Sequence, residues 1–175
     1  IRHSQGWSLP NGQKNSTFQL PAPEPNETIG KGSVLRDLAD HPWAGTLVNV
    51  SLVAIDGLGQ ENSSEIIAIV LPERIFNHPV ARGLIEARKM LNRPGENAME
   101  EVVSNLEKIA KRPQHFYNDT VVFLALTIAQ ARLRYDKRST VRDDVQHILW
   151  ETALRLEDWD FAVAERNLRE IQKSI

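Results

Sequence analysis

The chain has 175 residues, a net charge of −2, 41% hydrophobic and 25% charged residues. This composition excludes collagen-like, low-complexity and wholly disordered chains, and no apolar run approaches the ~18–20 residues that a membrane span needs. The chain contains no cysteine, which excludes disulfides, thiol catalysis and cysteine-based zinc sites. Because acidic and basic residues nearly balance, the bulk charge also argues against a nucleic-acid binder.

The two halves of the chain differ in composition. Residues 1–70 hold seven of the nine Gly and five of the nine Pro, whereas residues 71–175 hold 17 basic and 16 acidic residues. This change predicts β or irregular structure followed by helices, and therefore an α+β fold. We expect a β-rich module over 1–71 and a helical bundle over 72–175. The chain starts at Ile1 without a signal peptide, and we expect it to be a segment of a longer protein.

Alternating apolar residues predict the strands of the first half. The clearest run covers about 47–56, and a second covers about 65–71, with turn formers between them. Alternate apolar residues on both sides of the turn at 10–12 indicate two further short strands. The hairpin resembles the last two strands of bacterial Ig-like modules, although a full sandwich needs roughly 100 residues. We expect a partial Ig-like antiparallel module that lacks some of the strands of a full sandwich, with a small sheet packed on the helices as the alternative.

Helical periodicity predicts an antiparallel bundle of about five helices over 80–92, 98–111, 118–136, 140–157 and 160 to the end. The third is apolar at almost every early position, which predicts a central helix buried on most sides. The fifth carries a stripe that steps by three and four, formed by Phe161, Ala164, Leu168, Ile171 and Ile175. Such a stripe is typical of helix pairing.

Several sequence blocks, in this order, resemble an uncharacterised alphaproteobacterial membrane-protein family known as domain of unknown function 4175. The resemblance covers about residues 40–172, and its blocks are Trp43–Gly45, Ala54–Gln60, Leu71–Arg82, Glu86–Lys89, Leu149–Asp158 and Ala164–Arg169. It implies an extracytoplasmic segment of a longer inner-membrane protein, and it implies no activity. Where the family usually has Gly and Ser, this chain has Trp159 and Ala162, so we expect Asp160 to cap the last helix.

Carboxylates gather at the expected corner between the last two helices. Glu157 and Asp158 lie close to Asp160 and Arg155 in the sequence. A carboxylate pair can perform acid–base chemistry, but capping and ion pairing also explain carboxylates at a helix end. We expect a structural ion-pair network rather than catalysis, built from Glu73, Arg74, Arg82, Glu86, Arg88, Arg155, Glu157 and Asp158.

Other patterns give no chemical site. The five histidines are scattered without a His-Glu-x-x-His motif, and His41 lies in a stretch that predicts a tight corner. Gly57-Leu58-Gly59 precedes a strand rather than a helix, so it is not a phosphate loop. We therefore expect no catalytic, metal-binding or cofactor-binding residues, no cofactor and no nucleic-acid partner.

The interpretation we favour is a non-enzymatic scaffold or protein-interaction segment on the periplasmic side of the bacterial inner membrane. A protein partner would dock on the stripe from Phe161 to Ile175. The sequence leaves open whether the chain also forms a homo-oligomer. Two alternatives remain. One is a cell-envelope hydrolase using Glu157 and Asp158, and the other is a small-molecule sensor with an apolar pocket between sheet and bundle.

Overall fold

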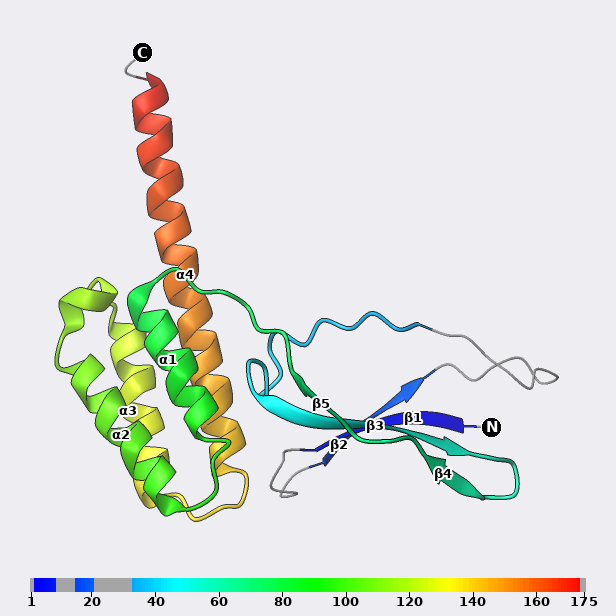
Figure 1. Ribbon diagram of the computed structural model, residues 1–175. Helices are drawn as coiled ribbons and strands as arrows, with labels where there is room; N and C mark the ends of the chain where they lie inside the picture. The colour runs from blue at the N-terminus through cyan, green and yellow to red at the C-terminus, as the bar shows by residue number, and fades with distance from the viewer. Residues whose placement is uncertain (1, 9–14, 21–32, 174–175) are drawn as a thin grey trace. The chain divides into compact units, whose positions relative to one another are not determined.

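The computed structural model describes residues 2–8, 15–20 and 33–173 of the chain (Figure 1). The chain divides into two compact units, a sheet unit over Ile1–Glu73 and a helical unit over Arg74–Ile175. The first contains an antiparallel sheet and the second contains four α-helices, which confirms the predicted α+β fold class. Among the described residues, no helix combines the length and the apolar character that crossing a membrane requires.

The sheet unit is built around its longest strand, β3 (Leu47–Ile55). One edge of β3 pairs with β1 (Arg2–Ser8), which in turn pairs with β2 (Asn15–Leu20). The other edge pairs with β4 (Glu61–Ser63) and β5 (Ile67–Val70), and every pairing is antiparallel. The described strands form a single sheet, so the second sheet of an Ig-like sandwich is not among them. A small core of Trp43, Val48 and Leu71 packs on this sheet.

The strand expected over 65–71 is shorter than predicted and covers only Ile67–Val70 (β5). The residues Glu61–Ser63 before it form a separate short strand, β4, which also pairs with β3. Val53 lies opposite Ser63 whereas Val50 lies opposite Ile67, so one extra residue separates the two registers. At this bulge Leu52 N–H donates to Ser64 Oγ (2.9 Å) and Ser64 N–H donates to the Leu52 carbonyl (2.8 Å). A bulge of this kind bends a strand and reverses which side chains face the core.

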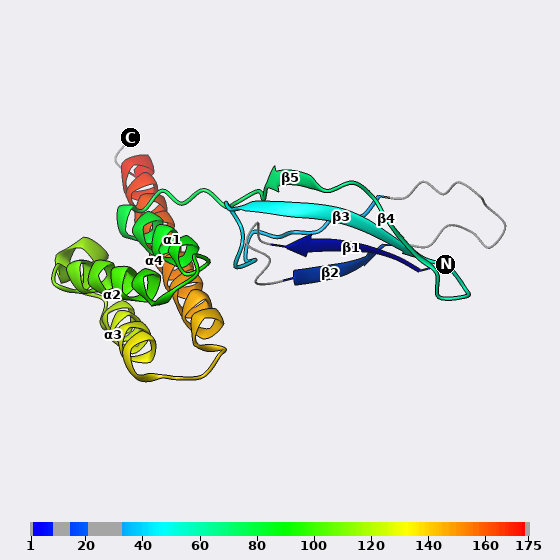
Figure 2. The same cartoon turned by 60° about the horizontal axis from the view of Figure 1, so that its bottom comes forward.

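The helical unit is an up-and-down bundle of α1 (Pro79–Met90), α2 (Glu96–Ala110), α3 (Thr120–Tyr135) and α4 (Val141–Lys173), with a 3₁₀ turn at Pro113–Phe116. Each helix packs against two others, in the cyclic order α1, α2, α3, α4 (Figure 2). The bundle core contains fully buried side chains from all four helices and the 3₁₀ turn, among them Leu84, Leu106, Phe116, Leu126 and Leu149.

The predicted break between the last two helices is wrong. A single helix of 33 residues, α4, runs through 158–160, and Asp160 lies inside it rather than at its N-terminus. The physical reason is that neither Gly nor Pro occurs between Val141 and Lys173, so no residue in this stretch ends the helix. The bundle therefore has four helices instead of about five.

The expectation for the third helix is also wrong. Only one row of α3 is buried, made of Val122, Leu126, Ala129 and Leu133. Large apolar side chains on its other faces are exposed to solvent, including Val121, Phe123, Leu124 and Ile128. Among the described helices, α3 packs mainly against α2 and α4, which leaves its outward side open. The helix begins two residues after the predicted start at 118: its N-cap is Asp119, and the preceding Asn118 has a left-handed backbone (φ 53°).

Candidate functional site

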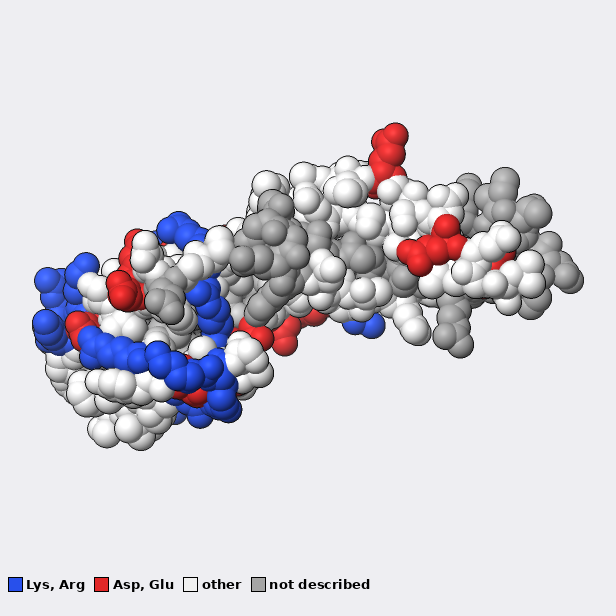
Figure 3. Space-filling model, turned by 90° about the horizontal axis from the view of Figure 1, so that it is seen from below, with Lys and Arg blue, Asp and Glu red and all other residues white. Residues whose placement is uncertain are grey.

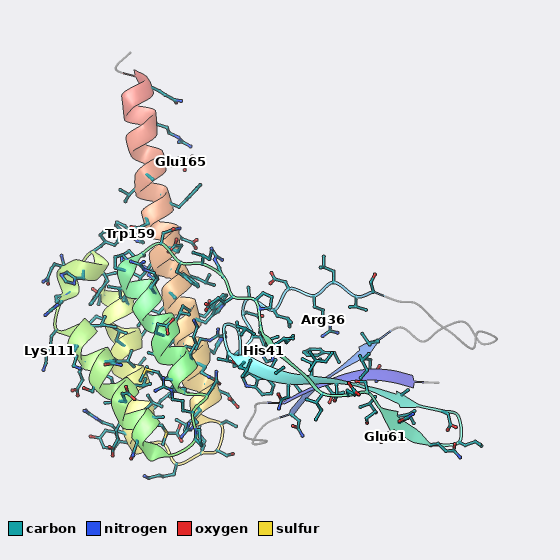
Figure 4. All side chains as sticks on the ribbon, viewed as in Figure 1. Arg36, His41, Glu61, Lys111, Trp159 and Glu165 are labelled. Atoms are coloured by element: carbon teal, nitrogen blue, oxygen red, sulfur yellow. The ribbon has the colours of Figure 1, made fainter. Side chains whose placement is uncertain are left out.

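Polar and aromatic side chains gather where α4 leaves the bundle. We call this group the shoulder cluster. It contains His78, Tyr117, Asp119, Arg155, Glu157, Trp159 and Asp160. Three elements supply its members: the start of α1, the turn before α3, and the middle of α4. Trp159 marks its position in Figure 4.

Glu157 binds the chain just before α1. Its Oε1 accepts from Asn77 N–H (2.8 Å) and Asn77 Nδ2 (2.7 Å), and its Oε2 accepts from His78 N–H (3.0 Å). The His78 ring then caps the helix, because its Nδ1 accepts from the amides of Val80 (3.2 Å) and Ala81 (3.3 Å). Residue 79 is Pro and has no N–H. Glu157 and His78 therefore satisfy the amides from 77 to 81, which a helix N-terminus otherwise leaves unpaired.

The protonation of Glu157 follows from these contacts. Burial alone raises the pKa of this carboxyl, but the hydrogen bonds from His78 and Asn77, together with the charge of Arg74, outweigh it and lower the pKa below its ordinary value. A general acid at neutral pH needs the opposite, a raised pKa. Glu157 is thus an ionised structural acceptor.

Tyr117 connects the turn before α3 to α4. Its backbone is left-handed (φ 59°), which is uncommon for an aromatic residue. The ring stacks on Trp159 with centroids 5.1 Å apart and lies 5.6 Å from the His78 ring. Its hydroxyl donates to the Asp160 carboxylate. That hydrogen bond, with burial and the negative charge of Asp160, raises the pKa of Tyr117 to about 12, so the phenol is a hydrogen-bond donor rather than a base.

Asp119 and Arg155 form a second link between α3 and α4. Asp119 Oδ1 accepts from the amides of Val121 (2.7 Å) and Val122 (3.3 Å), as an N-cap does. Its Oδ2 accepts from Arg155 Nε at 2.7 Å. Burial raises the pKa of Asp119, but the Arg155 hydrogen bond and the two amides outweigh this effect and lower it. The arrangement stabilises charge instead of preparing a proton for transfer.

The structure distributes the eight residues of the expected ion-pair network over separate contacts. Arg155 pairs with Asp119 rather than with Glu157 or Asp158, and Glu86 pairs with Lys89 (2.9 Å). Two arginines lie over aromatic rings: Arg74 over Phe76 at 5.4 Å and buried Arg88 over Trp150 at 4.9 Å. Arg82 is exposed to solvent. Asp158 has no ion-pair or hydrogen-bond partner among the described residues. Glu73 belongs to the sheet unit rather than to the helical unit.

The stripe expected at the end of the chain begins on the exposed part of α4. Phe161 is 74% exposed and Ala164 is exposed as well. The side chains of Leu168 and Ile171, and the whole of Ile175, lie outside what the structure describes. Beyond Trp159, α4 extends past the other three helices, and Glu165 lies on this extension (Figures 1 and 4).

Sequence reasoning missed a second polar centre, at the opposite end of the bundle. The Arg142 guanidinium donates to three backbone carbonyls of the α1–α2 connection, those of Leu91 (2.9 Å), Arg93 (2.7 Å) and Gly95 (2.5 Å). Nearby, Asp144 accepts from Arg132 and Arg138. Lys and Arg side chains gather on this end of the bundle (Figure 3). No sequence motif marks a side chain that binds a loop about fifty positions away.

The histidines form no metal centre in the part of the chain that the structure describes, where no group of three or more His, Asp or Glu side chains could hold an ion. His41 has a local role in a turn. Its Nδ1 accepts from Trp43 N–H (3.1 Å), and the two rings meet edge to face with centroids 5.2 Å apart.

Comparisons with known proteins give one match. A family model described as "Domain of unknown function (DUF4175)" matches residues 7–175. No curated protein and no solved structure matches the chain.

Proposed function

Because the chain belongs to the DUF4175 family, a family of unknown function, we propose a role from its own geometry: it is a non-enzymatic protein-interaction segment that binds a partner along the exposed part of α4. One observation carries this proposal. The last buried residue of α4 among those described is Leu156, yet the helix continues to Lys173. These 17 further residues span roughly 25 Å at 1.5 Å per residue. We call residues 157–173 the α4 arm.

The α4 arm continues the row of positions that α4 presents to α1. Within the bundle, Gln146 donates to the Arg88 carbonyl (3.1 Å), Trp150 contacts the Arg88 guanidinium, and Glu157 binds the residues before α1. From Glu157, steps of four and three lead to Phe161 and Ala164, and then to the positions of Leu168 and Ile171. The same seam that packs on α1 thus extends beyond the start of α1, where no described helix covers it.

An unpartnered helix of this length is marginal in water, because most helical stability in proteins comes from packing of an apolar face. Local contacts support the α4 arm only modestly: Glu165 pairs with Arg169 (2.5 Å), an exposed pair of the kind worth a few tenths of a kcal/mol. A partner helix laid on the seam would supply the missing packing. The shoulder cluster then acts as the rigid base from which the α4 arm leaves the bundle.

In the described part of the chain, the contacts of Glu157 and Asp158 do not favour the cell-envelope hydrolase alternative. Glu157 uses both oxygens to hold the start of α1, and its pKa is lowered. Asp158 is exposed. We further propose, on the resemblance to the family alone, that the segment is bacterial and lies on the periplasmic side of the inner membrane as part of a membrane-anchored protein.

The experiment that tests this proposal is affinity purification of the tagged full-length protein from native membranes after mild cross-linking. We expect a discrete partner with the wild type and its loss in the double variant Leu168→Asp, Ile171→Asp. The matched control is Ala162→Asp, Lys173→Gln, which lowers the charge of the α4 arm by the same two units at positions away from the seam and should retain the partner. Equal recovery with both double variants would refute the proposed docking face.

A further inference from the structure

The outward face of α3 is an exposed apolar stripe. Its positions step by three and four along the whole helix: Val121, Leu124, Ile128, Ala131 and Tyr135. The four large side chains among them are between 39% and 77% exposed. Phe123, also exposed, borders the stripe. On the opposite side of the helix, the buried row from Val122 to Leu133 faces the bundle.

This face is also without charge over most of its length. No Asp, Glu, Lys or Arg occurs between Thr120 and Ala131. The two arginines near the end of α3 are held within the chain, Arg132 by Asp144 (2.9 Å) and Arg134 by Glu107. Contiguous exposed apolar surface on a folded domain marks an interaction site. An uncharged stripe offers nothing for a charged partner to recognise, but it can meet an identical stripe without like-charge repulsion.

We propose that a second copy of this chain covers the face, with the two α3 helices packed antiparallel across a twofold axis at Ile128. In that register Ile128 meets Ile128 of the partner subunit. Leu124, four positions before Ile128, lies closest to Ala131 of the partner subunit, three positions after Ile128, so a large side chain fits against a small one. At the ends, Val121 meets Tyr135 of the partner subunit. Alternation of large and small residues across a seam is what close helix packing requires.

The antiparallel arrangement is favoured over a parallel one on two grounds. In a parallel pair, each residue would meet its own copy in the partner subunit. The two Tyr135 side chains would then crowd one end of the seam, and the two Ala131 side chains would leave a gap one turn away. It would also align the two helix dipoles, whereas antiparallel helices oppose them. The twofold pairing is isologous, so it closes at a dimer.

The size of the face sets the expected affinity. The 16 residues of α3 span roughly 24 Å. A single pair of helices of that length buries less surface area than a standard stable interface does. We therefore expect a reversible dimer with a dissociation constant on the order of 10–100 µM. This inference does not depend on the role of the α4 arm.

Cysteine cross-linking tests the register, because the natural chain has no cysteine. Under mild oxidation of the whole chain, we expect Ile128→Cys to form a disulfide dimer. Leu124→Cys mixed with Ala131→Cys should form more mixed dimer than either variant forms alone. Ser104→Cys, on an exposed position of α2, is the matched control and should stay monomeric. Efficient dimerisation of Leu124→Cys by itself would overturn the antiparallel register.

Sedimentation velocity over a concentration series tests the dimer itself. The wild type should change from monomer to dimer with rising concentration, and Leu124→Glu should weaken the association at least tenfold while leaving the helix signal at 222 nm unchanged. Ser104→Glu adds the same charge on α2 and should associate like the wild type. A wild type that remains monomeric throughout, or a dimer that Leu124→Glu leaves intact, would overturn the proposal.

Discussion

Replacing Glu157 by Ala removes the acceptor that joins the middle of α4 to the start of α1. In the wild type this carboxylate receives Asn77 N–H, Asn77 Nδ2 and His78 N–H. The two Asn77 donors are exposed, so water replaces the carboxylate there at little cost. His78 is only 3% exposed, so its amide is left without an acceptor in a buried position.

The expected loss follows from that difference. A hydrogen bond to a charged group contributes about 1.5–3 kcal/mol, and a buried donor left unpaired costs a similar amount. With the exposed bonds discounted, we expect Glu157→Ala to lower the free energy of unfolding by about 2–3 kcal/mol. Glu157→Gln keeps one acceptor oxygen but directs an NH₂ group at a donor, so it should cost about half as much.

Urea denaturation of the full chain, followed by circular dichroism at 222 nm, measures this loss in the helical unit. Glu151→Ala is the matched control: it lies on the same helix, is exposed, and makes only a distant contact with His147 (3.9 Å). We expect that variant to fall within about 0.5 kcal/mol of the wild type. If Glu157→Ala were no less stable than Glu151→Ala, the role assigned to this carboxylate would be refuted.

The stabilisation by Glu157 also depends on pH in a defined direction. Its pKa is lowered on folding from an ordinary value of 4.5. The ionised form is therefore favoured by the fold, and its contribution is complete above pH 4.5 and disappears as the pH falls through the lowered pKa. The difference in stability between wild type and Glu157→Ala should be constant from pH 7 to about pH 5 and shrink at lower pH.

Three further variants test other parts of the helical unit. Tyr117→Phe should remove a phenol ionisation near pH 12 from the absorbance titration at 295 nm, since the bond to Asp160 raises that pKa. Asp119→Ala should lower the unfolding free energy by about 1–3 kcal/mol through loss of the α3 cap and the Arg155 contact, whereas Asp158→Ala should leave it unchanged. Arg142→Met should cost about 1–2 kcal/mol in the same urea assay, because the part-buried Leu91 carbonyl loses its donor while water replaces the guanidinium at the exposed carbonyls of Arg93 and Gly95.

Much of the fold could be predicted from local sequence signals. Proline and glycine mark the ends of α1 and α2, and helical periodicity locates both helices within a few residues. The strand β3 follows from the alternation of apolar and polar residues over 48–52. The break between the last two helices, which helical periodicity predicts at 158–160, is absent, because Trp159 and Ala162 are compatible with a continuous helix.

The site depended on tertiary contacts that local patterns do not encode. The sequence predicts a structural ion pair for Glu157, but its partners lie about eighty positions earlier and are two backbone amides and the Asn77 side-chain amide, which no local pattern indicates. The exposure of α3 was missed because an apolar helix in a sequence predicts burial, whether its outer face is covered by the same chain or by another.

The most direct test of the central claim is site-specific photo-cross-linking in the full-length protein in native membranes. A benzophenone amino acid at position 161 replaces an aromatic side chain that is already exposed on the α4 arm, and the same amino acid at Lys108, exposed on α2, provides the comparison. We predict a discrete adduct with another protein from position 161 and none from position 108. The same adducts from both positions, or none from position 161, would contradict the account.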